Sequence, residues 1–359
     1  MITLFFICVT SYFVYCLYIL FGLFRHIIKK KTPKKTNLVS VVIAARNEEK
    51  TLPKLLKDLV NQDYPKNKLE IIIANDRSSD KTGDIIEKTI SKHKNIKHVK
   101  IKNTNETAPK KFALEQAINQ SNGKIIISTD ADCRVLKTWV SSMVSSLNNK
   151  DGIIIGFSQV LAKSFFERYQ SIDFFCIFIA NVGFAGWEKF FSGSGQNLAY
   201  TKKSFYDIGG FSSKEKSISA DDMYLVQSIS SIEKCQINFD PNSYVSTYPE
   251  KTIISFLNQR IRWSSYAKNN LGRNNGFFLF LLSSFSCNVA TLFFIFMNPI
   301  ISLIIILVKS FLEGLIIFKG TKLFRIKISA GSFVFWSILQ PLYIPFVALA
   351  GLTKLYNWK

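Results

Sequence analysis

The chain has 359 residues and a formal net charge of +21, with 46 Lys and Arg against 25 Asp and Glu. Its six cysteines form no C-x-x-C pair and its three histidines are widely separated, which argues against a disulfide framework and a zinc site. Apolar residues make up 48% of the chain and gather at its two ends. The basic charge therefore points to anionic lipid headgroups and phosphorylated substrates, and nucleic acid is not expected as a partner.

The first predicted element is a charge-free apolar stretch, residues 2–24, which is long enough to span a bilayer as a helix. A cleaved signal peptide is the alternative. It would need a basic start, a shorter apolar core and a small-residue cleavage site, and the sequence shows none of these features. The basic residues that follow at once are Arg25, Lys29, Lys30, Lys31, Lys34 and Lys35. We therefore expect residues 1–25 to be a retained transmembrane anchor. By the positive-inside rule, the basic residues after it predict that the next domain is cytoplasmic.

Short apolar runs then alternate with amphipathic stretches. The predicted strands are residues 38–45, 69–74, 96–101, 124–129 and 153–157. The predicted helices are residues 50–61, 81–91, 110–120 and 137–148. Strands that alternate with helices predict an α/β fold with a mainly parallel, Rossmann-like sheet and right-handed crossovers.

The pattern changes after this region. Residues 160–191 are rich in aromatic side chains but carry several charges, which predicts an amphipathic segment at the membrane surface; a buried helix pair is the alternative. Residues 255–275 are also expected at the interface. A C-terminal transmembrane region of about three helices is predicted within residues 277–352. Inside it, Lys309 and Glu313 are four residues apart on one helix face and are expected to pair.

Two acids follow the central predicted strand, at Asp130 and Asp132. The carboxyl ends of strands hold the ligands of open α/β sheets, and carboxylate oxygens suit Mg²⁺ or Mn²⁺, which can bridge the oxygens of a diphosphate. The alternative is an ordinary turn in which an Asp caps the next helix. Glu48 and Asp76 also follow strands and would lie on the same edge, which favours a nucleotide and metal cleft.

Two further motifs lie nearer the C-terminus. Asp221 and Asp222 precede a predicted helix. Both could cap the start of that helix, or one of them could be the general base that removes the proton of a sugar hydroxyl. Gln259, Arg262 and Trp263 share one helix face, which suits a diphosphate and a sugar ring. The alternative for this face is anchoring at the membrane interface.

The ordered set of motifs resembles the family 2 glycosyltransferases of GT-A fold, in particular the membrane-embedded branch similar to cellulose, chitin, hyaluronan and poly-N-acetylglucosamine synthases. The resemblance runs from about Val39 to Trp263. Its motifs are residues 41–48, residues 75–82, Lys110-x-x-Ala113–Leu114, Asp130–Ala131–Asp132, Asn197–Leu198–Ala199, Gly209–Gly210–Phe211, Asp221–Asp222 and Gln259-x-x-Arg262–Trp263. Each motif is short, but their order and separation are specific.

The resemblance implies a role for each of these residues. Asp222 would be the catalytic base and Asp132 the metal ligand. The donor nucleotide would be held by Glu48, Asp76, Lys110 and Asp130. The acceptor and diphosphate would be lined by Asp221, Gln259, Arg262 and Trp263.

The resemblance also implies an activity. The chain would be a metal-dependent, inverting hexosyltransferase with Mg²⁺ or Mn²⁺ as cofactor. It would move a sugar from a nucleotide-sugar, by expectation a UDP-sugar, to a glycan or lipid-linked acceptor for cell-surface polysaccharide or glycolipid synthesis. The transferase domain would be residues 36–270, facing the cytoplasm in a multi-pass protein of a bacterial inner or plasma membrane, in contact with membrane lipids.

The sequence departs from the family pattern in ways that leave alternatives open. Asp221 stands where the family has Glu, and Asn75 where it has Asp. Only four spans are visible, so both processive synthesis and a single transfer remain possible. A catalytically silent nucleotide-sugar-binding scaffold for a partner synthase is the main alternative, and a transporter built around Lys309 and Glu313 is another.

Overall fold

A computed structural model describes residues 2–28, 37–102, 108–147, 151–211, 221–271 and 274–353. The chain divides into two compact units. The sheet unit contains Ile27–Gln159 and Ser192–Tyr248, and the helical unit contains Met1–His26, Val160–Phe191 and Pro249–Lys359. The predicted extent of a transferase domain, residues 36–270, and the interfacial placement of residues 160–191 and 255–275 stay predictions. The basic run at residues 29–35 lies outside the described residues.

The sheet unit is built on seven strands in the order β3-β2-β1-β4-β8-β6-β9. The strands are β1 (Val39–Ala45), β2 (Leu69–Asp76), β3 (Ile96–Ile101), β4 (Ile125–Ser128), β6 (Asp151–Ile155), β8 (Leu198–Thr201) and β9 (Lys234–Ile237). Strands β3, β2, β1 and β4 are parallel, and β6 is parallel to β9. The predicted α/β fold with a mainly parallel sheet is therefore confirmed.

One strand of this sheet runs against the others. Strand β8 is antiparallel to both β4 and β6. No strand was predicted there, because the four residues of β8 directly follow a small-residue loop and mix apolar with polar side chains. A second, three-stranded sheet has the order β5-β10-β7, with β5 (Cys133–Val135), β7 (Ser158–Val160) and β10 (Val245–Thr247).

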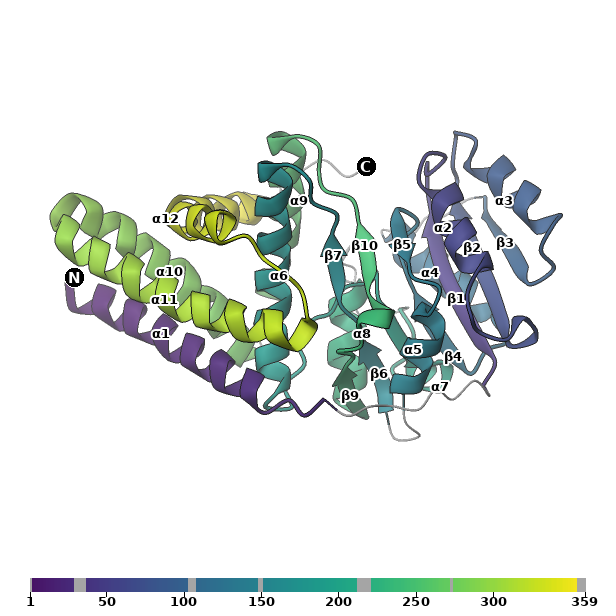
Figure 1. The fold of residues 1–359 in the computed structure, drawn as a ribbon, viewed down its shortest axis with the longest axis horizontal. Helices are drawn as coiled ribbons and strands as arrows, with labels where there is room; N and C mark the ends of the chain where they lie inside the picture. The colour runs from purple at the N-terminus through teal and green to yellow at the C-terminus, as the bar shows by residue number, and fades with distance from the viewer. Residues whose placement is uncertain are drawn as a thin grey trace. The chain divides into compact units, whose positions relative to one another are not determined.

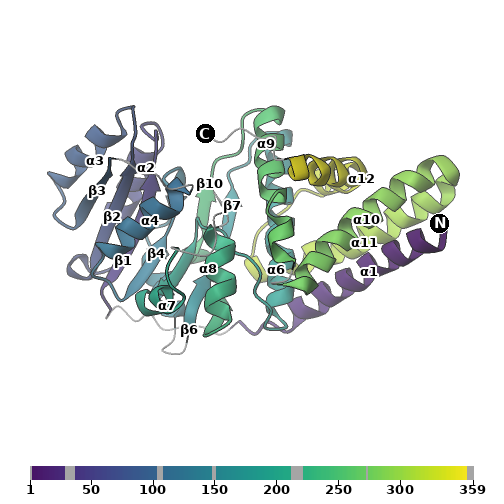
Figure 2. The same cartoon turned by 180° about the vertical axis from the view of Figure 1, so that it is seen from behind.

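Helices cover both faces of the large sheet (Figures 1 and 2). Alternate residues of β1, such as Val41 and Ile43, share one core with α2 (Leu52–Val60), α3 (Thr82–Ile90) and α5 (Trp139–Ser146). The opposite face carries α4 (Pro109–Asn119), which contacts β1, β2 and β3. The remaining elements of this unit are α7 (Lys202–Asp207), α8 (Asp221–Ser230) and the short 3-10 turns Lys66–Lys68 and Pro241–Ser243.

The order of strands fixes where a ligand can bind. The chain runs from β1 to β2 and β3 on one side and then returns to β4 on the other side of β1, so the order of strands reverses at β1. Open α/β sheets hold ligands at such a switch point, outside the carboxyl ends of the strands. The loops after β1, β2 and β4 meet at this edge, and they carry Glu48, Asp76, Asp130 and Asp132.

Among the described residues of the helical unit, four helices are long and apolar enough to span a membrane. They are α1 (Ile2–Phe24), α10 (Asn275–Met297), α11 (Pro299–Phe324) and α12 (Ala330–Thr353). Helix α11 continues through Lys319 and Lys322 to Phe324, because Lys is a good helix former. Helices α6 (Phe165–Ala185) and α9 (Ile253–Ser264) run across α1, α10 and α11 in both views, and a 3-10 turn, Ala267–Asn270, follows α9 (Figures 1 and 2).

The predicted pair in α11 is confirmed. Lys309 Nζ lies 3.0 Å from Glu313 Oε1, and both side chains are buried. Tyr12 of α1 donates to Glu313 at 2.7 Å, and Gln340 of α12 donates to it at 3.0 Å. A buried charge is tolerated where it is paired and hydrogen-bonded. This network therefore ties three helices together as a structural element.

Helices α1 and α6 approach each other backbone to backbone at glycines. A Cβ atom built on Gly22 of α1 would lie 1.9 Å from the carbonyl oxygen of Gly183 on α6. A Cβ on Gly186 would lie equally close, at 1.9 Å, to the carbonyl oxygen of Gly22. Only residues without a side chain fit such a crossing.

Replacing Gly22 by Val is therefore expected to separate α1 from α6. Overpacking a tight contact lowers the free energy of unfolding by about 1–3 kcal/mol, and a clash with backbone atoms should reach the upper part of that range. The measurement is the thermal unfolding midpoint of the purified chain in detergent. Gly276→Val is the matched control, since a Cβ at Gly276 meets nothing within 4 Å. Equal midpoints for the two variants would contradict the close crossing.

Candidate active site

The loops that follow β1 and β2 are joined to each other by hydrogen bonds. The backbone N–H of Glu48 donates to Thr82 Oγ1 at 2.8 Å, and the backbone N–H of Ser79 donates to Asn47 Oδ1 at 2.9 Å. Asn47 has a φ of 56°, a left-handed conformation that Asn tolerates better than most residues. The Glu48 carboxylate accepts a hydrogen bond from Thr51. These bonds fix the position of Glu48 at the edge of the sheet.

Asp76 is buried at this edge and holds two arginines. Arg77 Nε donates to Asp76 Oδ1 at 2.8 Å, and Arg46 Nη1 lies 3.8 Å from Asp76 Oδ2. Asp76 is only 4% exposed, and these two guanidinium groups balance the charge of its buried carboxylate. Sequence reasoning gave Arg46 and Arg77 no separate role. Their positions beside the predicted acids at the two strand ends were the available signal.

The centre of the site is an ammonium group between carboxylates from two distant segments. Lys110 Nζ, near the start of α4, lies 2.8 Å from Asp130 Oδ1. It lies 3.6 Å from Asp221 Oδ2, at the start of α8. The structure thus brings Lys110 together with Asp130 and Asp221, and Asp222 adjoins them in the chain. The roles that the resemblance implies for these residues stay predictions.

The loop at residues 192–197 closes this cluster from one side. The backbone N–H of Gly195 donates to Asp222 Oδ2 at 3.2 Å, and Ser128 Oγ donates to the Gly195 carbonyl at 3.3 Å. A Cβ on Gly195 would lie 3.3 Å from Asp221 Oδ2 and 3.8 Å from Lys110 Nζ. Glycine therefore lets the backbone approach the carboxylates closely.

A buried asparagine anchors that loop. Asn197 is fully buried, and its Oδ1 accepts a hydrogen bond from Trp139 Nε1 at 2.9 Å. Its Nδ2 donates to the carbonyl oxygens of Phe157 and Ser243, both at 2.8 Å. Because each polar atom of the amide is used, Asn197 holds the loop in one position.

The carboxylates of the site are electrostatically crowded. Burial, together with the charges of Asp130 and Glu48, raises the pKa of Asp132 from 3.8 to about 6. Burial and the charge of Asp221 raise the pKa of Asp222 from 3.8 to about 6, although Lys110 acts in the opposite direction. Burial lowers the pKa of Lys110, but the carboxylates of Asp130 and Asp221 more than offset it, so this pKa is raised overall.

These residues fit a divalent cation. Asp130 and Asp132 supply hard oxygen donors, and the crowding of carboxylates around Asp132 is an arrangement that a cation relieves. Within the described ranges, no three or more His, Cys, Asp or Glu side chains are grouped so that they could hold a metal ion by themselves. Mg²⁺ is often bound through one or two carboxylates, with water and substrate phosphates as its other ligands.

The residues predicted for the acceptor side lie on α9 of the helical unit and form a cluster of their own. Gln259 Nε2 donates to Glu250 Oε1 at 3.0 Å, and its Oε1 accepts from Arg260. The Arg260 guanidinium lies 4.2 Å from the centre of the Trp263 ring. Arg262, the cation that the spacing singled out, is half-buried on the same helix.

Sequence reasoning missed Arg260. Its Nε donates to Asp173 Oδ2 of α6 at 2.6 Å, and both side chains are almost fully buried. Two residues of α12 complete the group: Trp336 Nε1 donates to Asp173 at 3.2 Å, and the Tyr343 hydroxyl donates to it at 3.4 Å. The available signal was Asp173 itself, because a carboxylate inside an apolar helix requires a charged or hydrogen-bonding partner.

Comparison with known proteins adds an independent observation. Residues 40–220 match the family model described as "Glycosyl transferase family 2". A Bacillus subtilis protein named "Probable glycosyltransferase YdaM" is 34% identical over 278 residues, which are 73% of this chain and 65% of that protein. The beta-monoglucosyldiacylglycerol synthase of Trichormus variabilis is 31% identical over 131 residues, 36% of this chain and 28% of that protein. The chain thus covers less than two thirds of the length of these relatives.

A solved structure shares the fold. The mannosyltransferase PcManGT of Pyrobaculum calidifontis, solved with GDP-Man and Mn²⁺, superposes with a TM-score of 0.70 at 17% identity. The superposition covers 99% of this chain and 100% of that one. The sheet unit accordingly has the predicted GT-A fold, and the family model covers the segment that carries Glu48, Asp76, Lys110, Asp130 and Asp132. The chain belongs to the family 2 glycosyltransferases.

Proposed function

We propose that the chain is a membrane-bound, metal-dependent, inverting glycosyltransferase. It transfers a sugar from a nucleotide-sugar, in the first instance a UDP-sugar, to a hydroxyl of a lipid, lipid-linked or glycan acceptor. The observation that carries this proposal is the position of Lys110 between Asp130 and Asp221 at the switch point of the sheet. In support of the proposal, this one cation lies near Asp130, which would belong to the donor side, and near Asp221, the neighbour of the candidate base Asp222.

Asp222 has the position and charge of a general base. Its Oδ2 accepts the backbone N–H of Gly195 at 3.2 Å and its Oδ1 accepts that of Met223 at 2.7 Å. Its raised pKa makes it a better proton acceptor than an ordinary Asp. A sugar hydroxyl becomes a strong nucleophile when its proton is removed in the transition state. One base suffices for direct displacement, which inverts the anomeric centre. Asp222 takes the proton in this scheme.

The donor side has to stabilise a departing diphosphate. Asp132, with Asp130 beside it, would hold Mg²⁺ or Mn²⁺, which supplies positive charge to the leaving group when bound. Lys110 is a second, permanent cation at the same place. Glu48 and the Asp76 carboxylate with its arginines would hold the nucleotide at the adjoining edge.

The helical unit supports a lipid-facing acceptor. Lys319 Nζ lies 4.2 Å from the Phe24 ring, so the carboxyl ends of α1 and α11 lie together. Arg25, Lys322 and Arg325 belong to the same two ends, which by the positive-inside rule are cytoplasmic. The name of the Trichormus variabilis relative refers to a glucosylated diacylglycerol, and a lipid acceptor is proposed here by analogy. Gln259, Arg262 and Trp263 would line the acceptor side.

The experiment is an assay of free nucleoside diphosphate with the purified full chain in nanodiscs. The donors are UDP-glucose, UDP-N-acetylglucosamine, UDP-galactose and GDP-mannose, each with Mg²⁺, Mn²⁺ or a chelator, and with membrane lipid extract as acceptor. Release from one donor that needs both metal and extract is expected. Binding of a donor without release under any of these conditions would contradict the proposal and favour the scaffold alternative.

The pH dependence gives a separate prediction. A base must be deprotonated, so turnover at saturating donor and metal should fall as the pH drops through about 6, the pKa of Asp222. Asp221 raises this pKa and Lys110 lowers it. In the Lys110→Gln variant the residual turnover should therefore fall at a higher pH than in the wild type. A Lys203→Gln variant, which removes an exposed lysine paired with Asp207, should leave the profile unchanged.

A further inference from the structure

A groove between α2 and α3 lies on the sheet unit, outside the candidate active site. One cavity of 380 Å³ is lined by residues of the two linked loops and of α3, including Glu49, Lys81 and Lys88. A second of 460 Å³ runs on between the helices, and the two share Ile85 and Lys88. Ligand pockets have volumes of about 300–1,000 Å³, so the groove is large enough for a small organic molecule.

The larger cavity is basic. Its charged or titratable lining residues are Lys57 of α2, Lys88 of α3, and Lys92 and His93 just beyond α3, and no acid lines it. In the part of the chain that the structure describes, the ammonium groups of Lys57, Lys88 and Lys92 have no carboxylate within ion-pair distance.

Other lysines of the same unit behave differently. Lys97 pairs with Glu70, Lys100 with Glu87, and Lys203 with Asp207. The larger cavity therefore has lysines from α2, from α3 and from just beyond α3 in its lining, and no acid. The acids of the groove, Glu49 and Asp84, line the smaller cavity.

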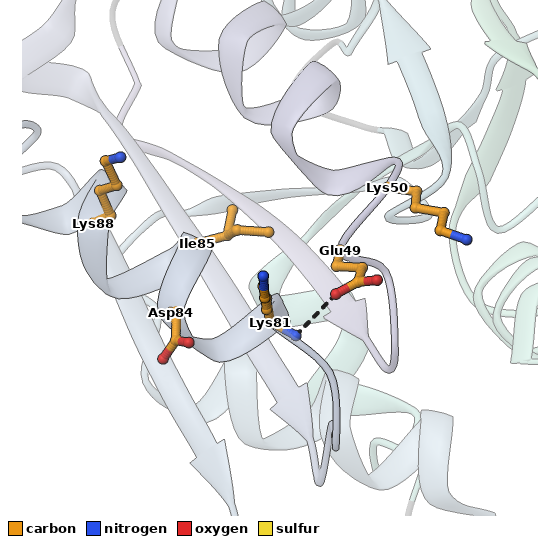
Figure 3. A pocket seen from close by; sticks show the side chains of 6 residues that line it. All are labelled: Glu49, Lys50, Lys81, Asp84, Ile85 and Lys88. Carbon is orange, nitrogen blue, oxygen red and sulfur yellow. Dashed lines mark hydrogen bonds between the residues drawn. The ribbon is translucent and has the colours of Figure 1, made fainter.

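The floor of the groove is apolar. Leu56 is buried beneath it, and Val60 and Ile85 are half-buried side chains that pack against the core. Figure 3 shows Ile85 between the side chains of Lys81 and Lys88 in the smaller cavity. In the same view the backbone N–H of Lys81 donates to Glu49 at 3.2 Å, and Asp84 is the second acid that lines this smaller cavity.

The geometry points to a ligand with an anionic head and an apolar body. We propose that the groove between α2 and α3 binds an organic phosphate, with its phosphoryl group among Lys57, Lys88 and Lys92 and its apolar part on Val60 and Ile85. A phosphate monoester carries a charge of about −1.5 to −2 at neutral pH and offers three acceptor oxygens, which matches three unpaired ammonium groups. Such a ligand could be a phosphate ester in solution or the headgroup of a lipid phosphate.

The test for the soluble source is calorimetric titration of the full chain in neutral phosphatidylcholine nanodiscs. The probes are hexyl phosphate, inorganic phosphate and hexanol. Hexyl phosphate is expected to bind more tightly than inorganic phosphate, and hexanol not at all. The triple variant Lys57→Gln, Lys88→Gln and Lys92→Gln should weaken hexyl phosphate by about tenfold or more, which corresponds to about 1.4 kcal/mol.

The control removes the same charge elsewhere. Lys124, Lys137 and Lys234 are exposed lysines of the sheet unit that line neither cavity, and their triple Gln variant should bind hexyl phosphate as the wild type does. Ile85→Ala should weaken hexyl phosphate but not inorganic phosphate. Equal losses in the two triple variants would reduce the effect to net charge and overturn the proposal.

The lipid source is tested by acetylation footprinting of the lysines, read by mass spectrometry. Protection of Lys57, Lys88 and Lys92 in phosphatidic acid nanodiscs, relative to neutral ones, indicates a lipid phosphate. Protection in neutral nanodiscs only after hexyl phosphate is added indicates a soluble ester. The absence of both protection and calorimetric binding would overturn the proposal, and neither readout depends on transferase activity.

Discussion

The Asp222→Asn variant is expected to lose turnover by about 10²–10⁴-fold, the usual contribution of a general base. Asn keeps the shape of the side chain and can still accept the backbone N–H of Gly195, but it cannot take a proton. Donor binding should stay close to the wild-type value, because the donor-side residues are untouched. The measurement is single-turnover nucleotide release, with donor affinity determined separately.

The same variant has a stability readout with a defined sign. The pKa of Asp222 in the folded chain is about 6, above its ordinary value of 3.8, so holding this carboxylate charged destabilises the folded state. Asn should therefore raise the thermal midpoint at pH 8, where the wild-type group is charged, and have no such effect below pH 3.8.

Asp221→Asn is the matched control for turnover. If it abolishes turnover while Asp222→Asn does not, the base has been assigned to the wrong carboxylate.

The Arg260→Met variant is expected to lose about 3–5 kcal/mol of unfolding free energy, since removing one partner of a buried ion pair leaves the other uncompensated. Here the uncompensated group is the Asp173 carboxylate, which would keep only Trp336 and Tyr343 as donors. The measurement is the thermal or denaturant midpoint in detergent. Because Arg260 also contacts Gln259 and Trp263, these two side chains should lose their fixed positions too.

A double substitution separates loss of the pair from loss of packing. Replacing Asp173 by Leu together with Arg260 by Met removes both charges from the interior, and most of the lost stability should return. The exposed pair of Lys203 and Asp207 is the matched control, and breaking it should cost at most about 1 kcal/mol. A double variant as unstable as the single one would contradict the ion-pair explanation.

The sequence predicted most of the fold because the deciding signals are local. Long apolar stretches located the four helices that are apolar enough to span a membrane, and apolar runs bounded by turn residues located β1, β2, β3, β4 and β6. Strand β8 was missed because its position is set by pairing with β4 and β6 and not by its own four residues. The small sheet of β5, β7 and β10 was missed for the same reason, since each strand has only three residues.

The sequence could predict those residues of the candidate site that directly follow a strand. Asp130 is such a residue, but its ion pair with Lys110 is a contact that the structure adds. The spacing of α9 singled out Arg262 but gave no sign that Arg260 is the buried cation. That choice depends on Asp173, which is 87 residues away in the chain, and a contact over such a distance has no local signature.

The most direct test of the central claim follows the sugar itself. The full chain in nanodiscs would receive a nucleotide-sugar labelled in the sugar, with Mn²⁺ and membrane lipid extract, and label in extracted product would be counted against free nucleoside diphosphate. The account predicts equal amounts of both, product of inverted configuration, and loss of both in Asp222→Asn. Nucleotide release without labelled product, or product that retains the donor configuration, would contradict it.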